Sequence, residues 1–176
     1  MAITTISDLT AALKTGARSN LFRVTLSTDS LSGQETAFSY LCKGAQLPSS
    51  TLGLIEVPFM AGRRYKIAGD RTFPEWTTTV INDSNQKIRE AVENLQKKYS
   101  TTDYDSDIAK ELTGSSPTDF TTITVEQYDL SGTVVYTYTL YNCWPTDIST
   151  IDLSYDSTDT LEEFTVTWAY DYFTFE

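Results

Sequence analysis

Apolar and polar residues alternate along much of the chain, and this pattern predicts a fold built mainly from β-strands. The clearest run lies within residues 161–173, where large apolar residues occupy every second position from Phe164 to Tyr172. Because the side chains of a strand point alternately to its two faces, this run predicts a strand with one buried face. Similar runs predict strands over residues 20–27, 36–43, 63–68, 76–82, 121–128, 133–144 and 148–155.

Short connections rich in turn-forming residues separate most of these strands. Residues 129–132 and 156–159 predict two hairpin turns, and the Gly69-Asp70 pair predicts a turn after residues 63–68. Short connections favour antiparallel pairing. We therefore predict a mainly β fold, an antiparallel β-sandwich or a partly closed barrel, with one flanking α-helix and an extended hairpin or arm.

The flanking helix is predicted over residues 83–99, where apolar residues recur with a helical period. These apolar residues are Ile88, Val92, Leu95 and Tyr99. Asp83 or Ser84 is the expected N-cap, and Glu93 and Lys97 are expected to pair on the solvent-facing side. The helix is expected to pack across the sheet.

The length of 176 residues fits a single domain, residues 1–176. Residues 1–19 are expected to form an N-terminal arm with a short helix over 4–16, for which Ser7 is the expected N-cap and Gly16 the C-cap. So short a helix is not stable alone and must dock on another surface. Residues 100–119 are polar with little periodicity and predict an exposed loop.

Residues 47–66 interrupt the strand pattern with proline and glycine, which predicts an extended arm leaving the main sheet. Apolar side chains on such an arm need a partner, so we expect the arm to contact other subunits. The candidate subunit or ring-interface residues are Leu52, Leu54, Ile55, Val57, Phe59, Met60, Arg63, Arg64, Lys66, Asp70 and Arg71.

Charge is unevenly distributed along the chain. The formal net charge is −11, yet residues 1–110 carry 13 Lys and Arg against 12 Asp and Glu, whereas residues 111–176 carry 12 acidic residues and no Lys or Arg. Such an acidic half does not bind nucleic acid, because phosphates are bound by cations. Solubility explains the sign of the net charge but not its segregation, which favours an acidic partner surface or a repulsive channel wall.

Histidine is absent from the sequence, which removes Ser-His-Asp and Cys-His catalysis and the commonest metal ligand. No glycine pattern for binding phosphate occurs, and the acidic residues of 152–163 lack the spacing of a calcium loop. Cys42 and Cys143 are expected to be buried reduced thiols, the alternative being a disulfide. We therefore predict that the protein is not an enzyme and has no cofactor or metal. No apolar run suggests a membrane anchor, and the N-terminus does not resemble a secretory signal.

The run AGDRTF-x-x-W-x-x-x-V-x-N-D, residues 68–83, resembles the central motif of the tail tube proteins of contractile-tailed bacteriophages, the myovirus major tail tube family. Within this run, Phe73 and Trp76 are expected to anchor the core beside the 83–99 helix. The resemblance extends over roughly residues 17–172, and only the loop at 100–119 is unlike the family. The other similar segments are residues 17–22, 42–43, 47–48, 57–60, 144–146, 163–167 and 171–172.

This resemblance implies a virion subunit, assembled in the host cytoplasm, that forms hexameric rings stacked head to tail into a hollow tube inside a contractile sheath. The implied partners are further copies of the chain, the sheath protein, the baseplate and tail-terminator proteins, the tape-measure protein in the bore, and DNA in transit without specific binding. Acids of residues 111–176 would line the bore or meet the cations of a neighbouring ring. Two alternatives are the inner tube of a bacteriocin or type VI-like contractile injection device, and a small β-barrel that binds a ligand or glycan.

Overall fold

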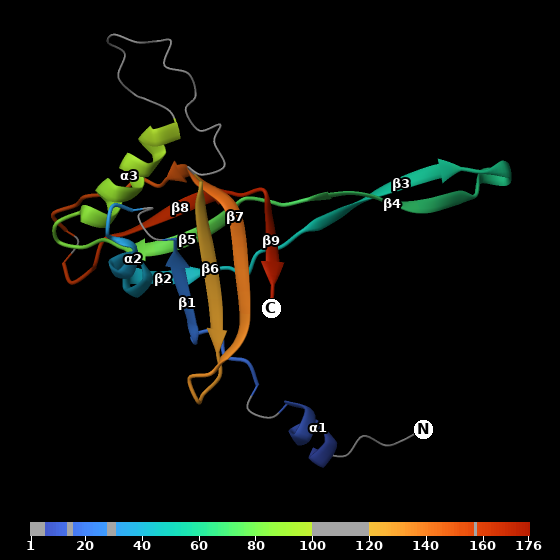
Figure 1. The fold of residues 1–176 in the computed structure, drawn as a ribbon, viewed down its shortest axis with the longest axis horizontal. Helices are drawn as coiled ribbons and strands as arrows, with labels where there is room; N and C mark the ends of the chain where they lie inside the picture. Colours follow the sequence, from blue (N-terminus) through green and yellow to red (C-terminus); the bar gives the residue numbers. More distant parts are fainter. Residues whose placement is uncertain (1–5, 14–15, 28–30, 100–119, 157) are drawn as a thin grey trace, which may run out of the picture.

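The computed structural model of the chain describes residues 6–13, 16–27, 31–99, 120–156 and 158–176 (Figure 1). The helices are α1 (Ile6–Leu13), α2 (Glu35–Leu41), α3 (Lys87–Tyr99) and the 3-10 turn η1 (Met60–Gly62). The strands are β1 (Phe22–Leu26), β2 (Cys42–Ala45), β3 (Thr51–Pro58), β4 (Arg64–Thr72), β5 (Trp76–Ile81), β6 (Thr121–Tyr128), β7 (Val134–Ile148), β8 (Glu163–Ala169) and β9 (Tyr172–Phe175).

Seven antiparallel strands form the main sheet in the order β1-β6-β7-β8-β5-β2, with β9 paired to β7. The long strand β7 joins the two halves of this sheet, because its first part pairs with β6 and β9 and its last residues pair with β8. The outer strands β1 and β2 also contact each other, and α2 packs against both. The sheet is therefore curved into a partly closed barrel, which confirms the predicted mainly β, antiparallel fold.

A corner between the two halves of the sheet lies at Asn142 and Asp171. Asn142 has a left-handed backbone with φ of 57°, and the register of β7 against β6 shifts there. The Asn142 Nδ2 donates a hydrogen bond of 2.6 Å to Asp171 Oδ2, and the Asp171 amide donates to the Tyr141 carbonyl at 3.1 Å. The predicted strand over 161–173 is consequently two strands, β8 and β9, which pair with different parts of β7.

The prediction of a strand over residues 36–43 is wrong for residues 36–41, because residues 35–41 form α2, and a strand begins only at Cys42 as β2. Glu35 begins this helix, and its Oε1 accepts hydrogen bonds from the amides of Leu31 and Gly33 at 2.8 and 3.4 Å. Phe38 is fully buried and meets Trp168 edge to face, with 6.3 Å between ring centroids. The fold thus has α2 in addition to the one flanking helix that was predicted.

The strand predicted over residues 148–155 is also absent. Instead, β7 continues through Trp144 and Pro145 to Ile148, with a register shift after Pro145. Proline has no amide hydrogen for the ladder, and the irregularity accommodates it. Residues 149–156 and 158–162, which follow, form no helix or strand.

The core lies inside the curved sheet. Alternate residues of β5, β6 and β8 are buried, and the Trp168 Nε1 donates a hydrogen bond of 3.0 Å to Thr78 Oγ1. Trp76 is buried, as predicted. Phe73 contacts Tyr170 and Phe173, with centroids 6.0 and 5.6 Å apart, whereas α3 packs against β7. Phe73 thus packs against the core, and its aromatic partners come from β9 and from the residue that follows β8.

Helix α3 has the predicted apolar face but a different start and a different ion pair. Ile88, Val92 and Leu95 are buried against the core, as predicted. The helix begins at Lys87, so neither Asp83 nor Ser84 is its N-cap; the Asp83 carbonyl instead accepts from the Gln86 amide in the preceding turn, at 3.0 Å. Glu93 pairs with Arg89 at 3.0 Å rather than with Lys97.

The N-terminal helix is present as α1, and it lies away from the sheet (Figure 1). Gly16 has φ of 65°, which fits its expected place after the helix end. Ser7 lies inside the helix and is not its N-cap. The exposed loop predicted at 100–119 lies outside the described residues.

Candidate assembly surfaces

The most prominent feature of the surface is a long two-stranded arm made by β3 and β4, which projects from the curved sheet (Figure 1). At its tip, Ala61 and Gly62 both have left-handed backbones, with φ of 63° and 76°. The Phe59 amide donates a hydrogen bond of 2.7 Å to the Arg63 carbonyl and closes the turn. The arm spans residues 51–72, somewhat further along the chain than the predicted 47–66.

The base of the arm is narrow because two glycines face each other there. A Cβ on Gly53 would lie 3.1 Å from the Asp70 carbonyl oxygen, and one on Gly69 would lie 3.1 Å from the Gly53 carbonyl carbon. The register of β3 against β4 shifts at the same place. Gly69 and Asp70 therefore lie within β4, and the turn predicted at this pair is wrong.

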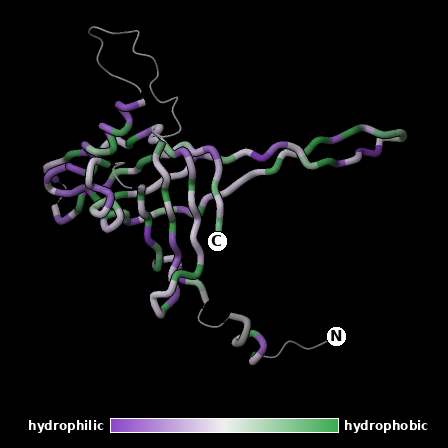
Figure 2. Tube along the Cα trace, viewed as in Figure 1, coloured by the Kyte–Doolittle hydropathy of each residue, from purple (hydrophilic) through white to green (hydrophobic). Residues whose placement is uncertain are grey.

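The outer part of the arm has one apolar face. Ile55 is paired with Ile67 and Val57 with Tyr65, and paired residues of an antiparallel ladder share a face. On the opposite face Glu56 lies across from Lys66, and the Arg64 Nη1 makes an ion pair with Glu56. Every residue of β3 is exposed, and Figure 2 shows the apolar positions along the outer arm.

All the candidate interface residues predicted from the sequence lie on this one arm and are exposed. Those on β3 and the tip are Leu52, Leu54, Ile55, Val57, Phe59, Met60 and Arg63, and those on β4 are Arg64, Lys66, Asp70 and Arg71. Two further apolar residues, Tyr65 and Ile67, complete the apolar face with exposed fractions of 68% and 44%. Sequence reasoning missed them because it treated residues 63–68 as an ordinary strand of the main sheet.

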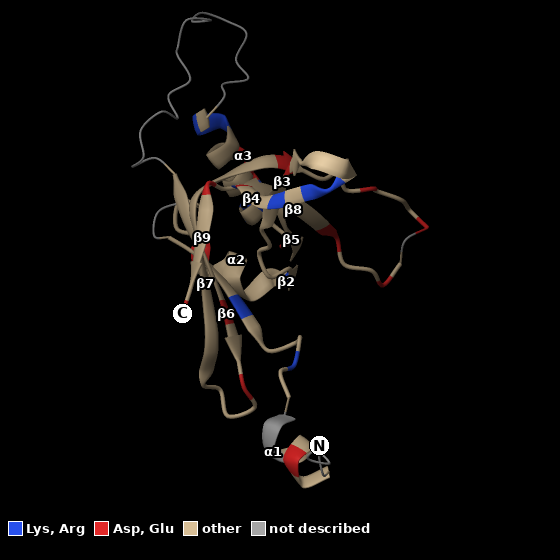
Figure 3. Ribbon diagram, turned by 90° about the vertical axis from the view of Figure 1, so that its right-hand side faces the viewer, with Lys and Arg blue, Asp and Glu red and all other residues tan. Residues whose placement is uncertain are grey.

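A second exposed apolar surface lies on the segment that joins β7 to β8, residues 149–156 and 158–162, here called the acidic loop. Leu153, Tyr155 and Leu161 have exposed fractions of 80%, 106% and 73%. The same residues include Asp152, Asp156, Asp159 and Glu162 and no cation. Figure 3 shows these acidic positions along the loop and Lys and Arg positions on the arm.

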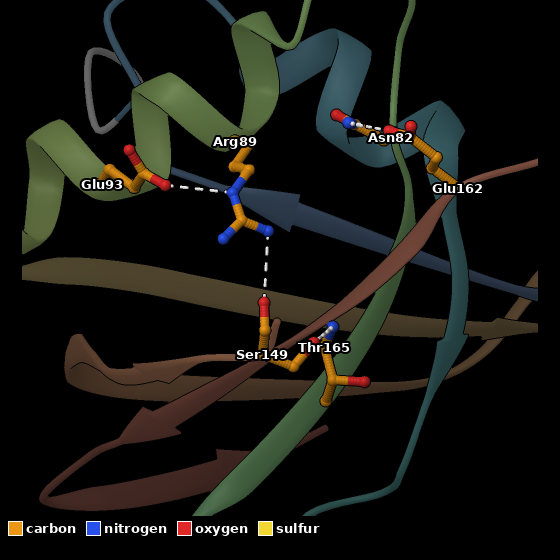
Figure 4. Close-up of polar contacts among 6 residues, drawn as sticks. All are labelled: Asn82, Arg89, Glu93, Ser149, Glu162 and Thr165. Carbon is orange, nitrogen blue, oxygen red and sulfur yellow. Dashed lines mark hydrogen bonds and ion pairs between the residues drawn. The ribbon is translucent and has the colours of Figure 1, made fainter. Parts of the chain in front are cut away.

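Both ends of the acidic loop are held by hydrogen bonds (Figure 4). At its start, Arg89 Nη1 donates to the Ser149 carbonyl at 3.2 Å, and Ser149 Oγ accepts from the Thr165 amide at 2.8 Å. At its end, the Asn82 amide donates to the Glu162 carbonyl at 2.8 Å, and Asn82 Nδ2 donates to Glu162 Oε2 at 2.9 Å. The loop is thus held by α3, by β8 and by Asn82, the residue that follows β5, while its middle faces solvent.

The cysteines are buried and carry no sign of reactivity. Cys42 and Cys143 are both free, as predicted. Burial raises the pKa of each thiol to about 12, against the weaker opposing effect of a backbone hydrogen bond. A thiol with such a pKa is a poor nucleophile and a poor metal ligand at neutral pH.

The described part of the chain contains no group of three or more His, Cys, Asp and Glu side chains arranged to hold a metal ion. Among the helices in the same ranges, none combines the length and the apolar character that a membrane span requires. The described surface carries an apolar and basic arm, an acidic loop, and the exposed side chains of residues 6–10 in α1.

Comparisons with known proteins give a consistent result over nearly the whole chain. A family model described as phage tail tube protein matches residues 10–176. The chain is 35% identical over 171 residues to tail tube protein gp19 of Enterobacteria phage T4, a match that covers 95% of this chain and 98% of that protein, and the figures for the gp19 of phage T6 are the same. Its fold is similar to that of a chain in the sheath-tube complex of an extracellular contractile injection system, PVC, in the extended state. That match has a TM-score of 0.66 at 14% identity and covers 99% of both chains.

Proposed function

The chain belongs to the phage tail tube protein family, and we propose that its copies form hexameric rings that stack into a hollow tube inside a contractile sheath. The observation that carries the proposal is the 35% identity to two phage tail tube proteins over 95% of the chain. The tube is a component of the virion, and its bore conducts DNA at ejection. Its further partners are the sheath, the baseplate, the tail terminator and the tape-measure protein.

The arm supports this proposal physically. Its apolar face is exposed in the single chain, and an exposed apolar patch of this kind is typical of a protein interface. The candidate residues from Leu52 to Arg71 are the proposed contacts between subunits. The match in sequence to phage proteins favours a virion over a bacteriocin or type VI-like device, because the likeness to the injection-system chain is one of fold. The family match also displaces the ligand-binding barrel as an account of the fold.

The acidic half of the chain fits a conduit for DNA. Residues 111–176 have no Lys or Arg, so a wall formed from them offers phosphates no cation to bind. DNA would then slide without the attraction that counterion release provides. We infer a structural role without catalysis, in keeping with the absence of histidine from the sequence.

Size-exclusion chromatography followed by negative-stain microscopy of the purified protein tests the proposal. Rings or tubes with six-fold symmetry are the expected result. A chain that remains monomeric at all concentrations, with or without the sheath protein present, would contradict it. In an electrophoretic mobility assay at physiological salt, tubes should leave the migration of double-stranded DNA unchanged.

A further inference from the structure

We propose that the acidic loop is the docking surface for the arm of a second copy of this chain. The inference rests on the proposed tube function and adds to it a specific receptor for the arm. The loop comprises residues 149–156 and 158–162, and the arm comprises residues 51–72. Four features of the described residues support the pairing: exposed apolar side chains, unpaired charges of opposite sign, the hydrogen bonds that hold the ends of the loop, and the positions of the two surfaces on the molecule.

Both surfaces have apolar side chains that the single chain leaves uncovered. On the loop these are Leu153, Tyr155 and Leu161, which are more exposed than most apolar residues of the protein. On the arm the apolar face of Ile55 and its ladder neighbours is exposed in the same way. Each apolar surface is stabilised when it is removed from water, so each requires a cover.

The charges indicate what covers the loop. Arg63, Lys66 and Arg71 of the arm form no ion pair with any described residue, and neither do Asp152, Asp156 and Asp159 of the loop. Residues 51–72 carry four cations and two acids, and the loop carries acids alone. Complementary charge steers association and fixes the partner, so an apolar surface with a basic rim is the fitting occupant.

The loop is also presented in a fixed position. Hydrogen bonds hold its two ends at Ser149 and Glu162 to α3, to β8 and to Asn82 after β5, as Figure 4 shows. Its exposed middle therefore has less conformational freedom to lose than a loop with free ends. An interface that needs little ordering retains more of its binding free energy.

The arm and the acidic loop leave the curved sheet on opposite sides (Figure 1). An arm cannot reach the loop of its own chain in this arrangement. A contact between two different patches on opposite sides is heterologous, and repeated contacts of this type generate closed rings or helical stacks. Repeated contacts between the arm of one copy and the loop of the next would therefore build a ring or a stack of rings.

Disulfide cross-linking of assembled tubes tests the proposal directly. The double variant Met60→Cys/Tyr155→Cys places one thiol at the tip of the arm and one in the loop. Since Cys42 and Cys143 are buried, the background from native thiols is low. We expect mild oxidation of tubes to give a ladder of covalently linked chains on a non-reducing gel, and each single variant to give none.

A matched control is Met60→Cys/Leu130→Cys, because Leu130 is another exposed apolar residue, in the β6–β7 turn. If normal tubes form and the ladder appears with Leu130→Cys but not with Tyr155→Cys, the receptor lies elsewhere and the proposal is overturned. Normal tubes without any ladder from the Tyr155→Cys pair overturn it as well. In both cases the tube function itself stands, since the tubes have formed.

Charge exchange provides a second test. Lys66→Glu or Asp156→Lys alone is expected to raise the protein concentration needed for assembly by about tenfold at low salt, because like charges then face each other. Combining the two reversals should restore assembly. If the combined variant does not assemble, the loop binds something other than the arm. The same conclusion follows if a single variant forms tubes of normal stability and loses only its ability to bind the sheath protein. If the unaltered protein forms no rings at all, the proposed function fails instead.

Discussion

Single residues decide where this sheet bends, and Asn142 is the clearest case. It adopts a left-handed backbone at the point where β7 changes its pairing partner, and its side chain holds Asp171 at the break between β8 and β9. Asparagine tolerates this conformation better than other residues with a Cβ. The curvature of the sheet, and with it the barrel, thus depends on a polar residue within an otherwise strand-like run.

Substitutions at Asn142 should separate backbone strain from the lost hydrogen bond. Asn142→Gly and Asn142→Val both remove the contact with Asp171, but only valine suffers the steric penalty of the left-handed region. We therefore expect the valine variant to be about 1–2 kcal/mol less stable than the glycine variant. Urea unfolding of a non-assembling background measures the difference. Equal stabilities would show that the corner does not require this conformation.

The two thiols give a prediction about pH. With the pKa raised from 9.0 to about 12, each native thiol has about 1000-fold less thiolate at pH 8 than an exposed one, and its reaction with Ellman's reagent should slow accordingly. Unfolded thiols ionise above pH 9 while folded ones stay protonated until about pH 12. The unfolded state then binds fewer protons, so the free energy of unfolding should fall as pH rises through that window.

Stopped-flow reaction with Ellman's reagent in buffer and in urea checks the first part, and urea melts at pH 8 and pH 10 check the second. The variant Cys42→Ala serves as the control, because it should leave one slow thiol, Cys143, and reduce the pH dependence. Rapid reaction of either cysteine in the folded protein would mean that its burial is transient.

At the scale of elements, the arm and the curved sheet have separate roles. The sheet contains the buried core, whereas β3 and β4 pair only with each other and expose nearly all their side chains. Gly53 and Gly69 allow the two strands to approach closely where the arm begins. The arm is therefore expected to contribute little to the stability of a single chain and to act in assembly.

Replacing the arm tests this separation. Thr51 and Thr72 are paired at its base, so residues 52–71 can be exchanged for an Asn-Gly turn without disturbing the neighbouring strands. We expect a folded monomer whose free energy of unfolding changes by less than about 1 kcal/mol, since exposed residues contribute little, and no tubes in negative stain. Leu130→Ala, at an exposed site away from the arm, is the control and should leave tubes intact. Tubes of ordinary appearance from the armless chain would refute the assembly role.

For the whole molecule, the arm and the acidic loop carry charge of opposite sign at two separate places, although cations such as Lys43 and Arg89 lie close to the loop. The cations of the arm project from one side, and the acids of the loop between β7 and β8 lie on the other (Figures 1 and 3). A chain with two complementary sides associates with copies of itself in a fixed direction. Association in one fixed direction is what a tube requires if it grows by adding one ring on top of another.

Limited trypsin digestion should distinguish free from assembled chains. Trypsin cuts after Lys and Arg, and the exposed Arg63, Arg64 and Lys66 lie at the end of the arm, where exposed backbone is open to proteases. We expect these bonds to be cut in the monomer and protected in tubes, with fragments identified by intact-mass spectrometry. The region from Glu111 onward has no trypsin site and provides an internal reference. Equal cleavage in both states would mean that the tip of the arm stays exposed after assembly.

The sequence by itself determined the fold class, most strands, the apolar face of α3 and the arm, because alternation and proline or glycine placement are local signals. The prediction from the sequence failed at residues 36–41. Phe38 and Cys42 are four residues apart, so they lie on the same face in a strand and also in a helix, and their spacing cannot distinguish the two. Tyr40 decides between the two, and in α2 it points to solvent.

Only the tertiary structure decided how distant segments meet. The split of residues 161–173 at Asp171 arises because β7 serves both halves of the sheet, and no local pattern marks it. Residues 149–155 have a strand-like sequence but pair with no strand in the described fold, and so they become part of the acidic loop. Pairing between strands is a long-range interaction, so the surfaces that it leaves exposed cannot be deduced from periodicity alone.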